Sequence, residues 1–157
     1  MEVRTEGTDM TTTEELKLET LFESDETAWL EAMSALAAEG RVSELDCSNL
    51  SEYLADMAKR DRREVFSRLV VLLTHLLKWD HQPDGRGGSW RGTIREQRRE
   101  LRQLLESGTL RNHAENVLAD AYAEARRQAA DETGLELSTF PADNSRTLDE
   151  ILGDNEG

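Results

Sequence analysis

The chain has few of the residues that stabilise disulfide-rich or irregular folds. Its 157 residues include a single cysteine, Cys47, so no disulfide can form within the chain. A lone thiol is typical of proteins that work in a reducing compartment. The only two prolines, Pro83 and Pro141, leave long stretches in which helices can run without interruption.

Long hydrophobic runs are also lacking. The longest, Leu69–Leu77, spans nine positions and is interrupted by Thr74 and His75, and the charged residues Arg68 and Lys78 bracket it. A helix that crosses a bilayer needs roughly 20 apolar residues, so we expect no membrane-spanning segment and no membrane partner. The first 20 residues lack the apolar core of a signal peptide. The sequence therefore predicts a cytoplasmic protein.

Alternation of polar and apolar residues with a period of two is absent, and the helical period dominates instead. Val65, Leu69, Leu72, Leu73 and Leu76 recur every three or four positions. A helix with apolar residues on every side is surrounded by protein. Residues 65–81 are therefore predicted to form a buried central helix.

Similar spacing and capping residues predict the other helices of an all-α fold. Thr147 and Glu150 have the spacing of a capping box, which predicts a short C-terminal helix over 148–152. The charged segment 59–63 is expected to form a bend or break before the central helix. The whole is a bundle of five main helices around residues 65–81, plus the short last helix. The other main helices are expected between Ser24 and Gly40, from Asp46 to about Met57, from Ser89 to Gly108, and through residues 114–129 to Gly134.

Composition suggests one folded domain with polar ends. We expect a flexible acidic arm over residues 1–20, a single helical domain over 21–152 and a disordered tail over 153–157. Net charge is −14, but its distribution is uneven. Residues 1–58 hold three basic and fifteen acidic side chains, residues 59–111 thirteen and seven, and residues 112–157 three and eleven. The simplest interpretation is that these segments neutralise one another.

Several fragments together resemble the uncharacterised bacterial family catalogued as domain of unknown function 29. The resemblance runs from about Leu21 to Leu152 and implies a compact all-helical fold without an established activity. The fragments that carry it are LFESDETAW (21–29), GRVSELD (40–46), RLVVLLTHLLKW (68–79), SWRGTIREQRRELRQLL (89–105), AYAEAR (121–126), ETGL (132–135) and LDEIL (148–152).

One segment departs from the family pattern. The resemblance implies an acidic cluster of the LAEEIE type in the second helix, whereas this chain reads LSEYLA. It keeps Glu52 but has Tyr53 and Ala55 at the other acidic positions, and Ala58 where a glycine is usual. If those carboxylates form a functional site, this chain has lost most of it.

Candidates for catalysis are sparse. Glu52, His75 and Lys78 are the best polar set, with Arg98 as an anion clamp. A single histidine on an apolar helix is more often a core residue hydrogen-bonded within the fold. No nucleophile motif or metal-ligand spacing accompanies the set, so we expect no enzyme activity, no metal and no cofactor.

The more informative pattern is a row of arginines. Arg91, Arg95, Arg98 and Arg102 follow spacings of four, three and four, which places them on one face of the predicted 90–107 helix. This face is the candidate binding face. Two interpretations stay open, because the guanidinium groups pair either with acidic side chains of segments 14–56 and 115–132 or with phosphate of a ligand. We favour internal pairing.

The sequence therefore predicts a non-catalytic interaction or regulatory module whose partner is another protein. The alternative is nucleic-acid or nucleotide binding through the arginine face, which the negative net charge disfavours. A second alternative is an enzyme that uses Glu52, His75 and Lys78. A homo-oligomer stays open as well.

Overall fold

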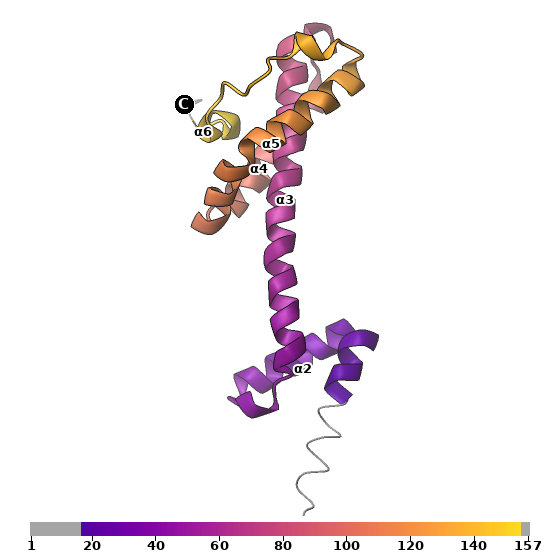
Figure 1. The fold of residues 1–157 in the computed structure, drawn as a ribbon, viewed down its shortest axis with the longest axis vertical. Helices are drawn as coiled ribbons and strands as arrows, with labels where there is room; N and C mark the ends of the chain where they lie inside the picture. Colours follow the sequence, from indigo (N-terminus) through magenta and orange to yellow (C-terminus); the bar gives the residue numbers. More distant parts are fainter. Residues whose placement is uncertain (1–16, 155–157) are drawn as a thin grey trace, which may run out of the picture. The chain divides into compact units, whose positions relative to one another are not determined.

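The computed structural model describes residues 17–154, and every regular element in that part of the chain is helical (Figure 1). The predicted all-α fold class is confirmed. Residues 17–24 are helical. The elements that follow are α2 (Glu26–Ala38), η1 (Val42–Glu44), α3 (Cys47–His81), η2 (Pro83–Gly85), α4 (Gly88–Leu104), α5 (Gly108–Thr133), η3 (Leu137–Thr139) and α6 (Leu148–Leu152), where η denotes a 3₁₀ helix.

Contacts divide the chain into two compact units, residues 1–58 and 59–157. This division into units does not test the single domain predicted over 21–152, which remains a prediction. Most of the arm predicted over 1–20 lies outside the described residues, and residues 17–20 belong to the helix at 17–24. Of the predicted tail, Gly153 and Asp154 are described, and the remainder again lies outside.

Helix α3 corrects the boundary predicted for the central helix. It begins at Cys47 and runs without a break to His81, through the charged segment 59–63. That segment contains neither proline nor glycine, and lysine and arginine have high helix propensities, so charge alone does not end a helix. The change in composition marks the boundary between the two units instead, which falls after Ala58.

The first unit is organised around Trp29, which is fully buried. Its ring contacts Phe22 at 4.8 Å and Tyr53 at 5.8 Å between centroids, and its indole N–H donates to Asp46 across 3.1 Å. Helix α2 has Asp25 as its N-cap, not the expected Ser24, because the Asp25 carboxylate accepts the backbone N–H of Ala28.

The core of the second unit combines α3 from Val65 onward with α4, α5 and α6. Figure 1 shows α5 running beside this part of α3 and the following segment returning to place α6 beside α4. Helix α3 is not buried on every side, because Val71, His75 and Trp79 form a partly exposed stripe at i, i+4 spacing. The buried core residues are Val65, Leu69, Val70, Leu72, Leu73, Leu76, Leu77, Leu101, Leu105, Ala114, Ala121, Tyr122, Ala125, Ala129, Phe140, Leu148, Ile151 and Leu152.

The helix ends in this unit depart from the predicted ones in two places. Gly108, predicted to end the helix that begins near Ser89, is the first residue of α5, and α4 ends at Leu104. Helix α4 begins at Gly88 with Gly87 as N-cap, so Ser89 lies inside its first turn, where its carbonyl accepts the Thr93 hydroxyl. The other signals behave as the sequence indicates. Gly134 ends α5 in the left-handed conformation at φ 71°, and Thr147 and Glu150 form both hydrogen bonds of a capping box at α6.

Candidate functional site

Helix α4 carries the four arginines of the predicted binding face, and the structure divides them into two pairs. Arg98 and Arg102, at its C-terminal half, contact the end of α6. Arg91 and Arg95, one turn apart in its N-terminal half, are exposed. The helical period therefore places the row on one face, while the element packed beside it decides which members are engaged.

Arg98 and Arg102 complete the C-terminus of α6. The Nε–H of Arg98 donates to the carbonyl of Ile151 across 2.9 Å, and a terminal N–H of Arg102 donates to the carbonyl of Leu152. Arg102 also pairs with Asp154 at 3.1 Å. The last carbonyls of a helix have no intrahelical partner and carry partial negative charge, so guanidinium groups bind there favourably. Arg98 and Arg102 therefore have a structural role, because they bind the C-terminus of α6.

Arg91 and Arg95 form no ion pair within residues 17–154. The pairing expected with acidic side chains of segments 14–56 and 115–132 is therefore not found for them, and Asp154, the acidic partner of Arg102, lies outside those segments. The guanidinium of Arg91 lies 5.7 Å from the ring centroid of Trp79, a weak cation–π contact. Arg95 makes no hydrogen bond, ion pair or ring contact with the described part of the chain. Two cationic groups are therefore open to an anion.

A pocket of about 550 Å³ adjoins these arginines in the second unit. Its volume lies within the range of small-molecule sites, roughly 300–1,000 Å³. Three apolar side chains form one part of the wall, and three arginines, two carboxylates and Gly153 form the rest. The lining residues are Leu76, Trp79 and Asp80 of α3, Arg91, Ile94 and Arg98 of α4, and Arg146, Glu150 and Gly153 at and around α6.

A second hollow of about 290 Å³ lies on the same face of α4. It shares Arg91, Ile94 and Arg98 with the larger pocket, so the two hollows adjoin. Its remaining lining residues are Arg95 and Arg102, and no carboxylate from residues 17–154 lines it. The site is thus a cationic hollow beside a mixed apolar and charged pocket.

The two carboxylates of the larger pocket are already engaged. Asp80 forms an ion pair with Arg146, which neutralises both. Glu150 accepts the backbone N–H of Thr147 across 3.1 Å as half of the capping box. Neither carboxylate is directed to Arg91 or Arg95 by a hydrogen bond or ion pair among the described residues.

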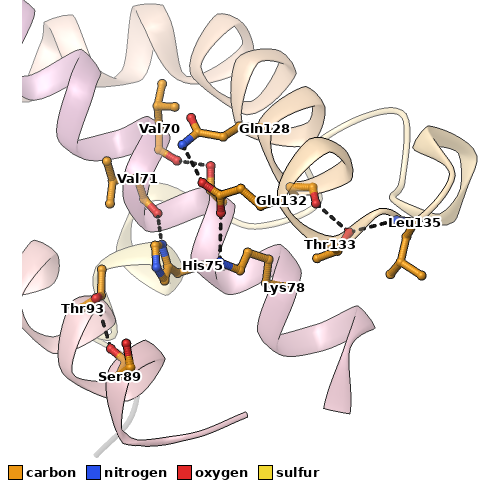
Figure 2. Close-up of polar contacts among 12 residues, drawn as sticks. Val70, Val71, His75, Lys78, Ser89, Thr93, Gln128, Glu132, Thr133 and Leu135 are labelled. Atoms are coloured by element: carbon orange, nitrogen blue, oxygen red, sulfur yellow. Dashed lines mark hydrogen bonds and ion pairs between the residues drawn. The ribbon is translucent and has the colours of Figure 1, made fainter. Parts of the chain in front are cut away.

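His75 and Lys78, two of the catalytic candidates, are held in contacts within the fold (Figure 2). His75 Nδ1 lies 2.8 Å from the carbonyl of Val71. Since a carbonyl only accepts, this nitrogen carries the proton and donates. The buried Lys78 donates to Glu132 across 2.9 Å, and its ammonium group lies 4.7 Å from the Trp90 ring centroid.

The contact with Lys78 changes the pKa of Glu132. Burial acts to raise the pKa of its carboxyl, but hydrogen bonds from Lys78 and Gln128 outweigh burial, and the pKa lies below its ordinary value. Glu52, the third candidate, is exposed and belongs to the other unit. Among the described residues, no group of three or more His, Cys, Asp or Glu side chains is placed to hold a metal ion.

Sequence reasoning missed several members of the pocket. Trp79 lies within residues 65–81, which were predicted to form a buried helix and not a pocket wall. Arg146, more than forty positions beyond α4, carries no local signal of this site. Nothing in a single sequence places the loop before α6 against α4. The capping box at Thr147 indicated that a helix begins there, but not where that helix packs.

These features define an all-helical protein with an arginine-lined pocket. The family model for the domain of unknown function DUF29 matches residues 21–155, and the chain belongs to that family. No curated protein and no solved structure was found to match it. Within residues 17–154, no helix has the length and apolar character that a bilayer crossing requires.

Proposed function

We propose that the chain is a non-catalytic binding module that recognises an anionic partner through the arginine face of α4. The observation that carries the proposal is the division of the arginine row. Arg98 and Arg102 contact the end of α6, whereas Arg91 and Arg95 are exposed, line a hollow, and pair with no carboxylate among residues 17–154. Arginine is enriched at binding surfaces because its planar fork donates several hydrogen bonds at once.

The contacts of the polar candidates support a non-catalytic role. His75 donates to a main-chain carbonyl, and Lys78 is buried against Glu132 and Trp90. A general base or nucleophile needs a group directed at substrate. Both side chains are instead used to fix α3 and its contact with α5. The partner we expect is another protein with an acidic surface. Nucleic acid is disfavoured because a net charge of −14 repels it at long range.

The experiment is native mass spectrometry of the full chain purified at its natural expression level, with two double variants. Arg91→Glu/Arg95→Glu reverses the proposed face. Arg99→Glu/Arg127→Glu is the matched control, because Arg99 and Arg127 are also exposed, form only surface ion pairs, and change the net charge equally. We expect a bound species in the wild type and in the control that is lost from the first variant.

Two results would contradict the proposal. One is a set of bound species that is identical in all three proteins. The other is turnover of an ester, phosphoester or nucleotide by the wild type that His75→Ala abolishes while its far-ultraviolet circular dichroism stays unchanged.

A further inference from the structure

We infer that the two adjoining hollows on α4 form one binding site for a small organic phosphate. Its phosphate group is held between Arg91 and Arg95, and its apolar body enters the larger pocket. This inference rests on the proposed function, because it uses the same arginine face. It goes further by giving that face a small-molecule ligand, which would compete with the protein partner for Arg91 and Arg95.

The phosphate half of the argument comes from the smaller hollow. Four of its five lining residues are arginines, and the fifth is Ile94. Arg91 and Arg95 project from successive turns of α4, and neither is neutralised by a described carboxylate. A phosphate monoester carries about 1.5 to 2 negative charges at neutral pH and offers three acceptor oxygens. A carboxylate carries one charge and two oxygens, so it matches two guanidinium forks less well.

The organic half comes from the larger pocket. Leu76, Trp79 and Ile94 give it an apolar wall, and Ile94 also lines the smaller hollow. A ligand that reaches from one hollow to the other therefore passes Ile94. A pocket of about 550 Å³ accommodates an aromatic ring or a nucleoside, and burial of its apolar surface adds binding energy that inorganic phosphate lacks.

The two carboxylates that line the larger pocket should repel a phosphate ligand only weakly. Asp80 is paired with Arg146, and Glu150 accepts a backbone N–H in the capping box. The guanidinium of Arg91, 5.7 Å from the centroid of Trp79, lies at the junction of the apolar wall and the cationic hollow. Arg91 thus serves both halves of the site, so its removal should weaken binding.

The test is isothermal titration of the full chain with phenyl phosphate, adenosine monophosphate, inorganic phosphate and benzoate. Phenyl phosphate and adenosine monophosphate represent two sources of the same chemistry, an aryl phosphate and a nucleotide. We expect at least one of them to bind about tenfold or more tightly than inorganic phosphate and benzoate. Arg91→Gln/Arg95→Gln weakens this binding at least about tenfold, because each lost charge-assisted hydrogen bond costs that much. Arg99→Gln/Arg127→Gln leaves it unchanged.

Three outcomes would overturn the inference. These are no saturable binding of either organic phosphate, equal binding by the two double variants, or binding of single-stranded DNA alone with a steep dependence on salt. The proposed function is tested separately. If neither organic phosphate binds but a protein is still lost from Arg91→Glu/Arg95→Glu, the proposed function stands and the inference about the occupant fails.

Discussion

The side chain of Arg98 donates from Nε–H to the main-chain oxygen of Ile151 across 2.9 Å, joining positions 53 apart in the sequence. With the bond from Arg102 to Leu152, it attaches the five-residue helix α6 to α4. Ile151 and Leu152 are also buried in the core of the second unit. A helix this short is not stable by itself, so its position depends on these contacts.

The first prediction compares arginines on the same face of α4. Arg98→Ala and Arg102→Ala should each lower the free energy of unfolding by about 1–2 kcal/mol, because each removes a charge-assisted hydrogen bond to α6. Arg95→Ala should change it by less than about 0.5 kcal/mol, as is usual for an exposed side chain without a partner. Urea denaturation of the three variants measures this. Equal losses would show that the row is not divided as described.

The second prediction concerns the conformation of Gly153, which ends α6 at φ 75°. A Cβ at this position would lie 3.1 Å from the guanidinium of Arg98. Gly153→Ala should therefore destabilise the protein by about 1–2 kcal/mol through backbone strain and displacement of Arg98. Gly92→Ala in α4 is the control, because a Cβ there meets no atom within 4 Å and alanine favours a helix. Thermal unfolding of both variants distinguishes them, and a destabilised control with an unaffected Gly153 variant would contradict the packing.

The third prediction tests the central part of α3. Leu73 is 1% exposed and surrounded by the core, so Leu73→Ala should cost about 2–5 kcal/mol. Val71→Ala, on the partly exposed stripe, should lower the free energy of unfolding by only about 1 kcal/mol. Chemical denaturation provides both values. A cost below about 1 kcal/mol at Leu73 would place this helix at a surface.

The fourth prediction concerns the continuity of α3 through residues 59–63. Proline inside a helix removes a hydrogen bond and clashes with the preceding turn, at a cost of about 3 kcal/mol. Asp61→Pro should therefore reduce helical content and stability, whereas Asp61→Ala should not. Circular dichroism and amide hydrogen exchange measure the two effects. If Asp61→Pro kept the helical content and stability of the wild type, α3 would have to be broken near residues 59–63, as the charged sequence suggested.

The fifth prediction follows from the ion pair between Lys78 and Glu132. The pKa of Glu132 is lowered in the folded state, so its carboxylate stabilises the fold above its ordinary unfolded pKa. That contribution is lost as the pH falls through the lowered value. Glu132→Gln should therefore be less stable than the wild type at pH 7, and the difference should disappear under acid conditions. Stability measured from neutral to acidic pH tests this, and a difference independent of pH would exclude the ion pair as its cause.

How far the fold could be predicted depends on whether a signal is local. The period of Leu69, Leu72, Leu73 and Leu76 is local, so the buried helix could be predicted from it. The capping box at Thr147 and the glycine at 134 are local as well, and both predictions are confirmed. The break predicted at the charged segment 59–63 was wrong, because charged residues can be exposed to solvent and still form a helix.

The candidate site could be predicted only in part for the same reason. Helical spacing placed Arg91, Arg95, Arg98 and Arg102 on one face. Which of them are engaged depends on α6, some 50 positions away, and no pattern in α4 encodes where α6 packs. Arg146 joins the pocket through the same packing. Tertiary contacts between distant segments thus determine which arginines are engaged and which residues line the pocket, and a local sequence pattern does not encode these contacts.

The most direct test is nuclear magnetic resonance of the arginine Nε–Hε groups while the full chain is titrated with phenyl phosphate. We predict that the signals of Arg91 and Arg95 shift together and saturate at one dissociation constant. The signals of Arg99, which pairs with Glu100, and of Arg127 on α5 should stay in place. Unchanged Arg91 and Arg95 signals, or a uniform shift of all arginines in proportion to added salt, would contradict an anion site on this face of α4.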